Sequence, residues 1–194
     1  MRQLLDTIPS DDVLPPSADV VVIGGGIAGA STAYWLARRG GSVALLEKGQ
    51  VGAEQSSRNW GWCRQAGRDR GEIPLIRQSV EMWAKMAEEI GADVGWARSG
   101  VLFVSDDEAK LAEWERWANH AGTHQVHSHM LGSAEVAALL PGSSRQWRGG
   151  MHTPSDGRAE PSKAVPAIAA AARRHGATIH QGCAARGLET EAGA

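Results

Sequence analysis

The sequence predicts an α/β fold built on a strand–helix–strand unit, and three observations indicate it. A short apolar run at Asp19–Ile23 is typical of a strand buried on both faces of a parallel sheet. A glycine-rich turn follows, and then a segment of helical length that ends in Arg38 and Arg39 before Gly40. A second apolar run, Ser42–Leu46, is the second strand. Because parallel strands need a crossover connection, these pieces form a βαβ unit.

Length and composition exclude several classes of protein. The chain has 194 residues and a formal net charge of −2, which fits one domain or slightly more and argues against a nucleic-acid binder that relies on bulk positive charge. Its two cysteines, Cys63 and Cys183, are far apart, which argues against a disulfide framework or a zinc ribbon. No apolar run approaches the ~18–20 residues of a membrane span, and the first residues do not resemble a secretory signal. The sequence therefore predicts a soluble cytoplasmic protein.

The N-terminal residues 1–18 are rich in Pro, Ser and Asp and are predicted to be a flexible, irregular tail. Residues 50–71 are predicted to be a polar loop. Apolar periodicity and capping signals predict the elements of the middle region. They are a helix at Glu72–Ile90, a strand at Gly100–Ser105, a helix from a Ser105/Glu108 capping box to about Ala121, a strand at His124–Met130, a helix at Ser133–Leu140 and a strand at Trp147–His152.

The last part of the chain is predicted to return to the α/β pattern. A helix at Pro161–His175 has Pro near its first position, and Pro166 predicts either a kink or a later start. Strands are predicted at Ala177–Gln181 and Ala185–Glu189.

Three glycines between the first strand and the first helix carry the strongest chemical signal. Gly24, Gly26 and Gly29 form a GxGxxG motif, whose glycines allow a tight turn, close approach of a pyrophosphate and close helix–strand packing. The helix N-terminus offers unpaired N–H groups to the phosphates. Glu47 ends the second strand, where a carboxylate accepts hydrogen bonds from ribose hydroxyls and repels a 2′-phosphate. Together these features predict a Rossmann-type site for an adenosine dinucleotide other than NADP, either FAD or NAD.

Two longer segments resemble one flavoenzyme family. Residues 21–49 with the Ser-Ser-Arg-Asn loop after them, and residues 149–177 with Asp156, Gly157 and Pro161, resemble the FAD-dependent D-amino-acid oxidase, glycine oxidase and sarcosine oxidase group. The resemblance implies FAD as cofactor and oxidation of a C–N bond in an amino acid or secondary amine, with hydride transfer to flavin N5. An NAD-dependent dehydrogenase is the alternative from the motif alone.

The resemblance also implies roles for individual residues. The predicted cofactor-binding residues are Gly24, Gly26, Ile27, Ala28, Gly29, Glu47, Lys48, Ser57, Arg58 and Asn59. Arg64 is the predicted catalytic residue, placed near the flavin ring or a substrate carboxylate, which a guanidinium can clamp with two hydrogen bonds. A solvated loop arginine is the alternative for Arg64. Trp60 and Trp62 either wall a pocket or belong to the core.

Members of this group are much longer than this chain and complete their flavin and substrate sites in a C-terminal half. The predicted organisation is a tail at 1–18, a Rossmann unit at 19–66, a partial α+β substrate domain at 67–154 and an incomplete return to the FAD domain at 155–194. The chain is therefore expected to be an N-terminal portion, or a truncated reading frame, of an enzyme that acts on a small amine or amino acid. A complementing chain is one source of the other half. A non-catalytic nucleotide-binding subunit is the alternative.

Two weaker signals are not expected to carry function. His120, His124, His127 and His129 lie close together, but no Cys or acidic cluster accompanies them, so no metal site is predicted. Cys63 is adjacent to Arg64, and a plain buried thiol is favoured over a reactive thiol or a covalent flavin link.

Overall fold

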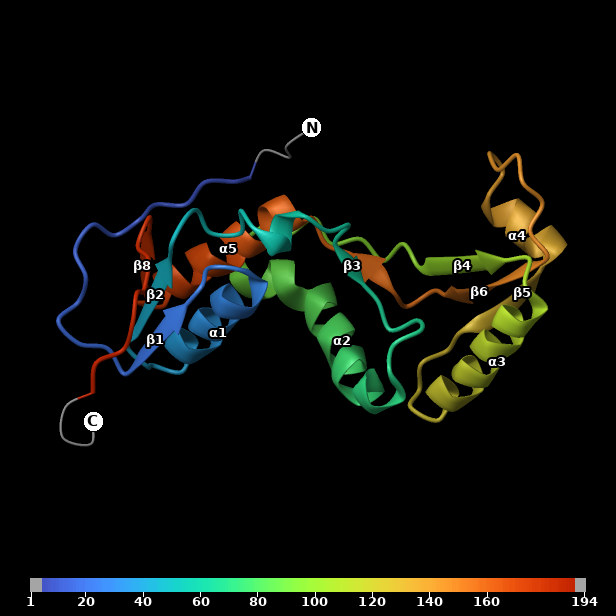
Figure 1. Ribbon diagram of the computed structural model, residues 1–194, viewed down its shortest axis with the longest axis horizontal. Helices are drawn as coiled ribbons and strands as arrows, with labels where there is room; N and C mark the ends of the chain where they lie inside the picture. The colour runs from blue at the N-terminus through green and yellow to red at the C-terminus, as the bar shows by residue number, and fades with distance from the viewer. Residues whose placement is uncertain (1–4, 191–194) are drawn as a thin grey trace. The chain divides into compact units, whose positions relative to one another are not determined.

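A computed structural model describes residues 5–190, and the chain divides into two units (Figure 1). Unit 1 comprises the chain up to Trp60, Ile90–Gly95 and the chain from Glu160 onward, and unit 2 comprises Gly61–Glu89 and Trp96–Ala159. The predicted domain divisions and the roles assigned to them stay a prediction. Within residues 5–190, no helix has the length and the apolar character needed to cross a bilayer.

Unit 1 contains the predicted βαβ unit. Strands β1 (Val20–Ile23), β2 (Val43–Glu47) and β8 (Thr178–Gln181) form a parallel sheet in the order β1-β2-β8. Helix α1 (Ile27–Arg38) is the crossover between β1 and β2. The α/β fold class and its first strand–helix–strand unit are therefore confirmed, with β2 displaced by one residue from its predicted range.

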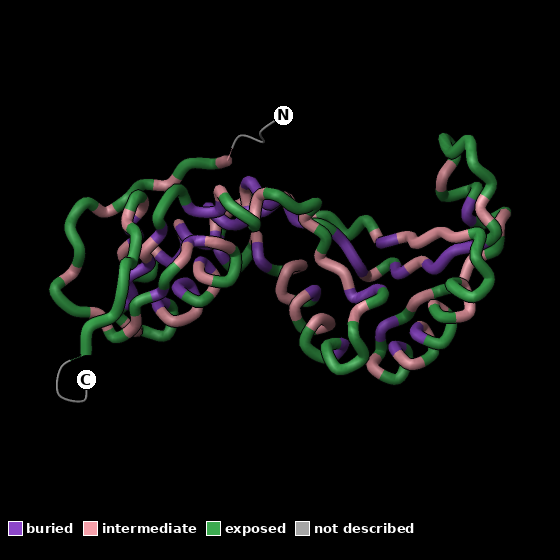
Figure 2. Tube along the Cα trace, in the orientation of Figure 1, coloured by how far each residue is buried: buried purple, intermediate pink, exposed green. Residues whose placement is uncertain are grey.

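Helix α1 packs against helix α5 (Pro161–Arg174) through small side chains. Alanine allows two helix backbones to approach closely, and nearly all of the residues on these two faces are excluded from solvent (Figure 2). The buried residues include Ala30, Ala33, Tyr34 and Ala37 on α1 and Ala164, Val165, Ile168, Ala169, Ala171 and Ala172 on α5. This helix pair fixes the N-terminus of α1, which follows the glycine motif.

Pro166 lies inside α5 without ending it, so the predicted later start of this helix is wrong. A proline has no N–H, which leaves the carbonyl oxygen of Ser162 without its usual partner one turn later. The backbone N–H of Asp6 donates to that oxygen at 3.1 Å. The N-terminal segment thus satisfies an acceptor that the proline leaves unpaired.

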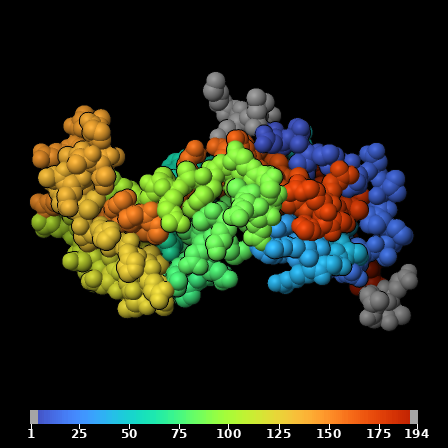
Figure 3. Space-filling model, turned by 180° about the vertical axis from the view of Figure 1, so that it is seen from behind, coloured from blue at the N-terminus to red at the C-terminus, as the bar shows by residue number. Residues whose placement is uncertain are grey.

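The segment from Asp6 to Asp11 contacts the rest of unit 1 at further points, although it forms no helix or strand. The carboxylate of Asp11 pairs with Arg173 and accepts the N–H of Ile179 at 2.8 Å, and the Asp11 N–H donates to the Ile179 carbonyl at 2.7 Å. Figure 3 shows this segment, in blue, lying against the orange-red residues of the C-terminal part. Sequence analysis predicted an irregular segment here and did not predict these attachments.

Unit 2 is built on a small antiparallel sheet. Strands β4 (Val101–Ser105), β6 (Gly149–Thr153) and β5 (His129–Gly132) lie in the order β4-β6-β5, and β3 (Trp62–Cys63) pairs separately with β7 (Gly157–Arg158). The helical elements are α2 (Ile73–Ile90), α3 (Glu108–Gly122), α4 (Ser133–Leu139) and the 3-10 turn η2 (Arg70–Glu72). Residues of α3 and the sheet, including Trp117, Ala121 and Met151, form its core.

Several predicted boundaries need correction. The strand predicted at His124–Met130 begins only at His129, because His124 and Gln125 form a turn in which Gln125 has a φ of 63°. Helix α3 is capped by Asp107, whose carboxylate accepts the N–H groups of Ala109 and Lys110, whereas Ser105 accepts the N–H of Asp107. No strand forms over the predicted range 185–189.

Candidate dinucleotide-binding site

The glycine motif lies where β1 ends and α1 begins, at the carboxyl edge of the parallel sheet. Gly24 has a φ of 103°, which L side chains rarely adopt, and its N–H still donates to Leu46 of β2 at 2.8 Å. A Cβ on Gly29 would lie 1.8 Å from the carbonyl oxygen of Gly24. The first glycine therefore permits the turn, and the third permits helix and strand to approach.

Helix α1 presents its N-terminus beside this turn. Gly26 is the N-cap, and the first backbone hydrogen bond of the helix runs from the Ala30 N–H to the Gly26 carbonyl. The N–H groups of Ile27, Ala28 and Gly29 precede this bond and have no acceptor within the helix. Such N–H groups, with the partial positive charge of the helix end, form a site for a phosphate.

Glu47 connects the second strand to the glycine turn. Its carboxylate accepts the N–H of Gly25 and the N–H of Gly49, each at 2.7 Å, and the residue is only 7% exposed. These two bonds fix the orientation of the carboxylate. A carboxylate has about four acceptor positions, so acceptor capacity remains for hydroxyl groups of a ligand.

Ser56 is the loop residue that reaches the helix N-terminus. Its Oγ accepts the N–H of Ile27 at 2.8 Å, and a Cβ on Gly26 would lie 3.1 Å from that oxygen. The hydroxyl thus occupies the position next to the first N–H of α1. Sequence analysis predicted the adjacent Ser57 and missed Ser56, and neither spacing nor residue type distinguishes the two serines.

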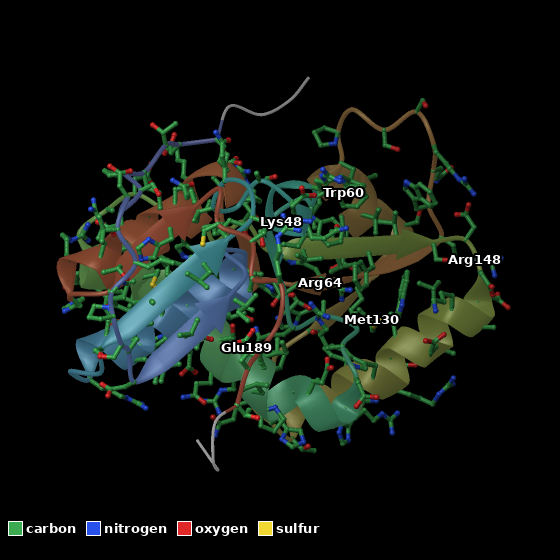
Figure 4. All side chains as sticks on the ribbon, turned by 60° about the vertical axis from the view of Figure 1, so that its left-hand side comes forward. Lys48, Trp60, Arg64, Met130, Arg148 and Glu189 are labelled. Carbon is green, nitrogen blue, oxygen red and sulfur yellow. The ribbon has the colours of Figure 1, made fainter. Side chains whose placement is uncertain are left out.

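The other predicted loop residues hydrogen-bond within their own segment, which includes the 3-10 turn η1 (Gln55–Ser57). The Ser57 hydroxyl donates to the Glu54 carbonyl at 3.2 Å, Arg58 forms an ion pair with Glu54 at 3.0 Å, and the Asn59 amide donates to Ser56 at 2.9 Å. Lys48 is exposed at the end of β2 (Figure 4). The binding roles of Lys48, Ser57, Arg58 and Asn59 stay predictions.

Arg64 lies in unit 2, and its guanidinium contacts two residues of the same unit. Nη1 donates to the carbonyl of Ala66, and Cζ lies 5.6 Å from the centroid of the Phe103 ring. Burial lowers the pKa of this guanidinium. Arg64 is half-buried, so a solvated loop arginine and a ligand for a substrate carboxylate both stay predictions.

A buried carboxylate holds the two residues that follow Arg64. Asp156 has no exposed surface and accepts the N–H of Gln65 at 2.8 Å, the N–H of Ala66 at 3.0 Å and the Gln65 side-chain amide at 3.0 Å. Asp156 thereby ties the loop after β3 to the turn before β7. Sequence analysis placed Asp156 in a segment that resembles the flavoenzyme family. It could not identify the hydrogen-bond partners of Asp156, because they lie about 90 residues earlier in the chain.

The remaining candidates are resolved by burial and contacts. Burial raises the pKa of the Cys63 thiol to about 11, which does not support a reactive thiolate. Trp60 is 78% exposed and Trp62 is 46% exposed, so neither is a core residue. The rings of His120 and His124 lie 5.3 Å apart, and within residues 5–190 no three His, Cys, Asp or Glu side chains gather as metal ligands.

Comparison with known proteins identifies relatives of this arrangement. A family model described as "FAD dependent oxidoreductase" (DAO) matches residues 19–194. Mitochondrial sarcosine dehydrogenase of Mus musculus is 30% identical over 178 residues. Glycine oxidase of Geobacillus kaustophilus is 28% identical over 179 residues. Among solved structures, L-amino acid deaminase from Proteus myxofaciens matches with a TM-score of 0.92 at 31% identity.

The chain spans less than half the length of each of these relatives. The sarcosine dehydrogenase match covers 90% of this chain and 19% of the relative, and the glycine oxidase match covers 84% and 45%. The L-amino acid deaminase match covers 97% of this chain and 43% of the solved structure. The similarity therefore includes almost all of this chain and only one part of each relative.

Proposed function

Since the chain belongs to the FAD-dependent oxidoreductase (DAO) family, we propose that it is the FAD-binding part of an enzyme that oxidises a C–N bond in an amino acid or secondary amine. The observation that carries this proposal is the convergence of Gly25, Glu47 and Ser56 on the N-terminus of α1. These residues come from three separate segments and meet where the motif predicts an adenosine diphosphate. The family is FAD-dependent, so the NAD-dependent alternative is set aside.

The residues present fit the adenosine and pyrophosphate portions of FAD. The N–H groups of Ile27, Ala28 and Gly29 are suited to phosphate oxygens, and no side chain projects from Gly24 or Gly26 into their approach. Glu47 is suited to the ribose hydroxyls, because two backbone N–H groups already orient its carboxylate. With a phosphate bound, the Ser56 hydroxyl would donate to a phosphate oxygen instead of accepting the Ile27 N–H.

FAD, when bound, supplies the acceptor for the hydride that leaves the substrate carbon. Arg64 is proposed to bind the carboxylate of an amino-acid substrate. Its guanidinium donates to a backbone carbonyl oxygen and lies 5.6 Å from the centroid of an aromatic ring. A guanidinium held in this way keeps its donors suited to a carboxylate. The printed names of the relatives, sarcosine dehydrogenase, glycine oxidase and L-amino acid deaminase, support an amine or amino-acid substrate.

Turnover is proposed to need residues outside 1–194, since more than half of each of these relatives has no counterpart in this chain. A complementing polypeptide is one source of those residues. A nucleotide-binding subunit without turnover is the alternative, and the experiment below distinguishes it. The predicted cytoplasmic location stays a prediction.

The test is a visible spectrum of the purified, folded chain after addition of FAD and removal of the excess. We expect protein-bound flavin bands near 370 and 450 nm, about the usual positions for an oxidised flavin. Anaerobic addition of single amino acids and secondary amines then tests for bleaching of these bands. Bound flavin without bleaching by any substrate supports the nucleotide-binding subunit. Folded chain that takes up no FAD contradicts the proposal.

A further inference from the structure

The residues that follow β2 help to hold the glycine turn in its conformation. The Gly52 N–H donates to the Gly25 carbonyl at 2.9 Å, and the Gly25 N–H donates to the Glu47 carboxylate. A Cβ on Gly25 would lie 3.0 Å from the side chain of Val51, which is itself only 1% exposed. The conformation of Gly25, between the first two glycines of the motif, therefore depends on where Val51 and Gly52 are held.

Gln181 holds Val51 in place with its side-chain amide. It is the last residue of β8, and it pairs with Glu47 in the parallel ladder. Its Oε1 accepts the Val51 N–H at 2.9 Å, and its Nε2 donates to the Ile8 carbonyl at 3.1 Å. Because an amide carries its acceptor and its donor in one plane, the bond to Ile8 orients the oxygen that receives Val51. One side chain thus links the N-terminal segment to the loop after β2.

The N-terminal segment, residues 5–11, meets the same part of unit 1 at further points. A Cβ on Gly52 would lie 3.3 Å from the Leu5 side chain, so Leu5 lies against the loop after β2. The Ser10 hydroxyl accepts the backbone N–H of Gln181 at 2.9 Å. Figure 3 shows the segment in blue beside the orange-red residues of the C-terminal part. The segment therefore contacts both the strand that carries Gln181 and the loop that Gln181 supports.

We propose that Gln181 is a positioning residue for the nucleotide and that the N-terminal segment acts on the glycine turn through it. The inference rests on the proposed function, because it takes the glycine turn as the site of the adenosine diphosphate. Gln181 acts through Val51, and the nucleotide contacts the turn. A turn that is already held in its binding conformation binds more tightly, because the ligand does not have to order it.

Docking of the segment and binding of the nucleotide then depend on each other. If the docked segment strengthens nucleotide binding, the nucleotide stabilises the docked segment by the same factor. The Asp6 N–H donates to the Ser162 carbonyl at 3.1 Å and the Asp11 N–H donates to the Ile179 carbonyl at 2.7 Å, and neither donor belongs to the glycine turn. Hydrogen exchange of these two amides therefore reports docking at a distance from the nucleotide.

The first test is calorimetric titration of the folded 194-residue chain with ADP, in the parent and in Gln181→Met. Methionine has a similar length and cannot replace either amide bond, so the buried Val51 N–H loses its acceptor. We expect ADP to bind about fivefold more weakly in this variant. The matched control is Gln78→Met, since Gln78 is exposed on α2 in unit 2. The control should bind ADP like the parent.

A double-mutant cycle tests whether the segment and Gln181 act together. Asp11→Ala removes the carboxylate that pairs with Arg173 and accepts the Ile179 N–H, so it loosens the segment without touching Gln181. We expect this variant to weaken ADP binding as well. In the double variant Asp11→Ala/Gln181→Met, the two effects should sum to less than their separate values, because both act through one segment.

Amide hydrogen exchange with saturating ADP gives a measurement that does not require the variants. In the parent, exchange at Asp6 and Asp11 should slow about fivefold, and in Gln181→Met this response should be lost. Unchanged ADP affinity in folded Gln181→Met overturns the proposal, and so do fully additive effects in the cycle or exchange in the parent that ignores ADP. A parent that binds neither ADP nor FAD overturns the proposed function and this inference together, whereas a parent that binds ADP with these responses absent overturns this inference alone.

Discussion

The glycine turn of unit 1 and the Arg64 loop of unit 2 are both held by a buried carboxylate, and they differ in what that carboxylate leaves exposed. Glu47 fixes Gly25 and Gly49 beside the N-terminus of α1, whose first N–H groups have no acceptor within the helix. Asp156, in the turn before β7, fixes Gln65 and Ala66 in the loop after β3. We infer that the first arrangement serves a ligand, whereas the second stabilises the fold of unit 2.

This difference supports our proposal that unit 1 binds the adenosine end of the cofactor. The Arg64 loop positions a guanidinium. The proposed role of this guanidinium is to bind a substrate carboxylate. Variants in the two regions should therefore separate nucleotide affinity from stability. The following predictions are ordered from the largest expected effect to the smallest.

Gly29→Ala should have the largest effect. Its new Cβ would meet the carbonyl oxygen of Gly24 at 1.8 Å, and a backbone atom cannot move aside as a flexible side chain can. We expect a loss of about 3 kcal/mol in the free energy of unfolding and no measurable FAD binding. Urea unfolding and FAD titration check this. Gly122→Ala, whose Cβ would meet nothing within 4 Å, should be nearly neutral, and equal behaviour of the two variants would contradict the packing argument.

Asp156→Asn should lower the stability of unit 2 and leave nucleotide affinity unchanged. The substitution places an amide donor near N–H groups that now donate to a carboxylate, so about 2 kcal/mol of stability should be lost from unit 2. ADP affinity should not change, because Asp156 does not contact the glycine turn. Calorimetric titration with ADP and urea unfolding measure both quantities. Glu113→Gln, which removes an exposed ion pair with Lys110, should cost less than about 0.5 kcal/mol.

Glu47→Gln should weaken the binding of ADP about tenfold, because the side chain loses its charge and one of its two acceptor oxygens. The cost in stability should be about 1 kcal/mol. The matched control is Glu54→Gln, since Glu54 is an exposed carboxylate paired with Arg58. Unchanged ADP affinity in Glu47→Gln would show that the carboxylate serves the fold alone.

Ser56→Ala should change ADP affinity by about 1 kcal/mol, or roughly fivefold, because its hydroxyl is next to the first N–H of α1. Ser57→Ala should change it less, since the Ser57 hydroxyl donates to Glu54 in its own turn. The comparison of these neighbours decides which serine serves the nucleotide. A larger effect at Ser57 would restore the interpretation from sequence alone.

Features set by neighbouring residues could be predicted from the sequence, whereas contacts between distant segments of the chain could not. The βαβ unit and the position of Glu47 at the end of β2 were predictable, because glycine spacing, apolar runs and a strand-end carboxylate are local signals. The bond from Asp6 to Ser162 was not, because it joins segments far apart in the chain. A local apolar pattern at 185–189 also gave a wrong strand, since a strand forms only where a neighbouring strand pairs with it.

The central claim is that unit 1 binds the adenosine diphosphate portion of FAD. The most direct measurement is calorimetric titration of the folded 194-residue chain with FAD, ADP and FMN in parallel. We predict that FAD and ADP bind with similar affinity and that FMN, which lacks the adenosine, does not bind. Binding of FMN as tight as that of ADP, or binding of none of the three, would contradict the account.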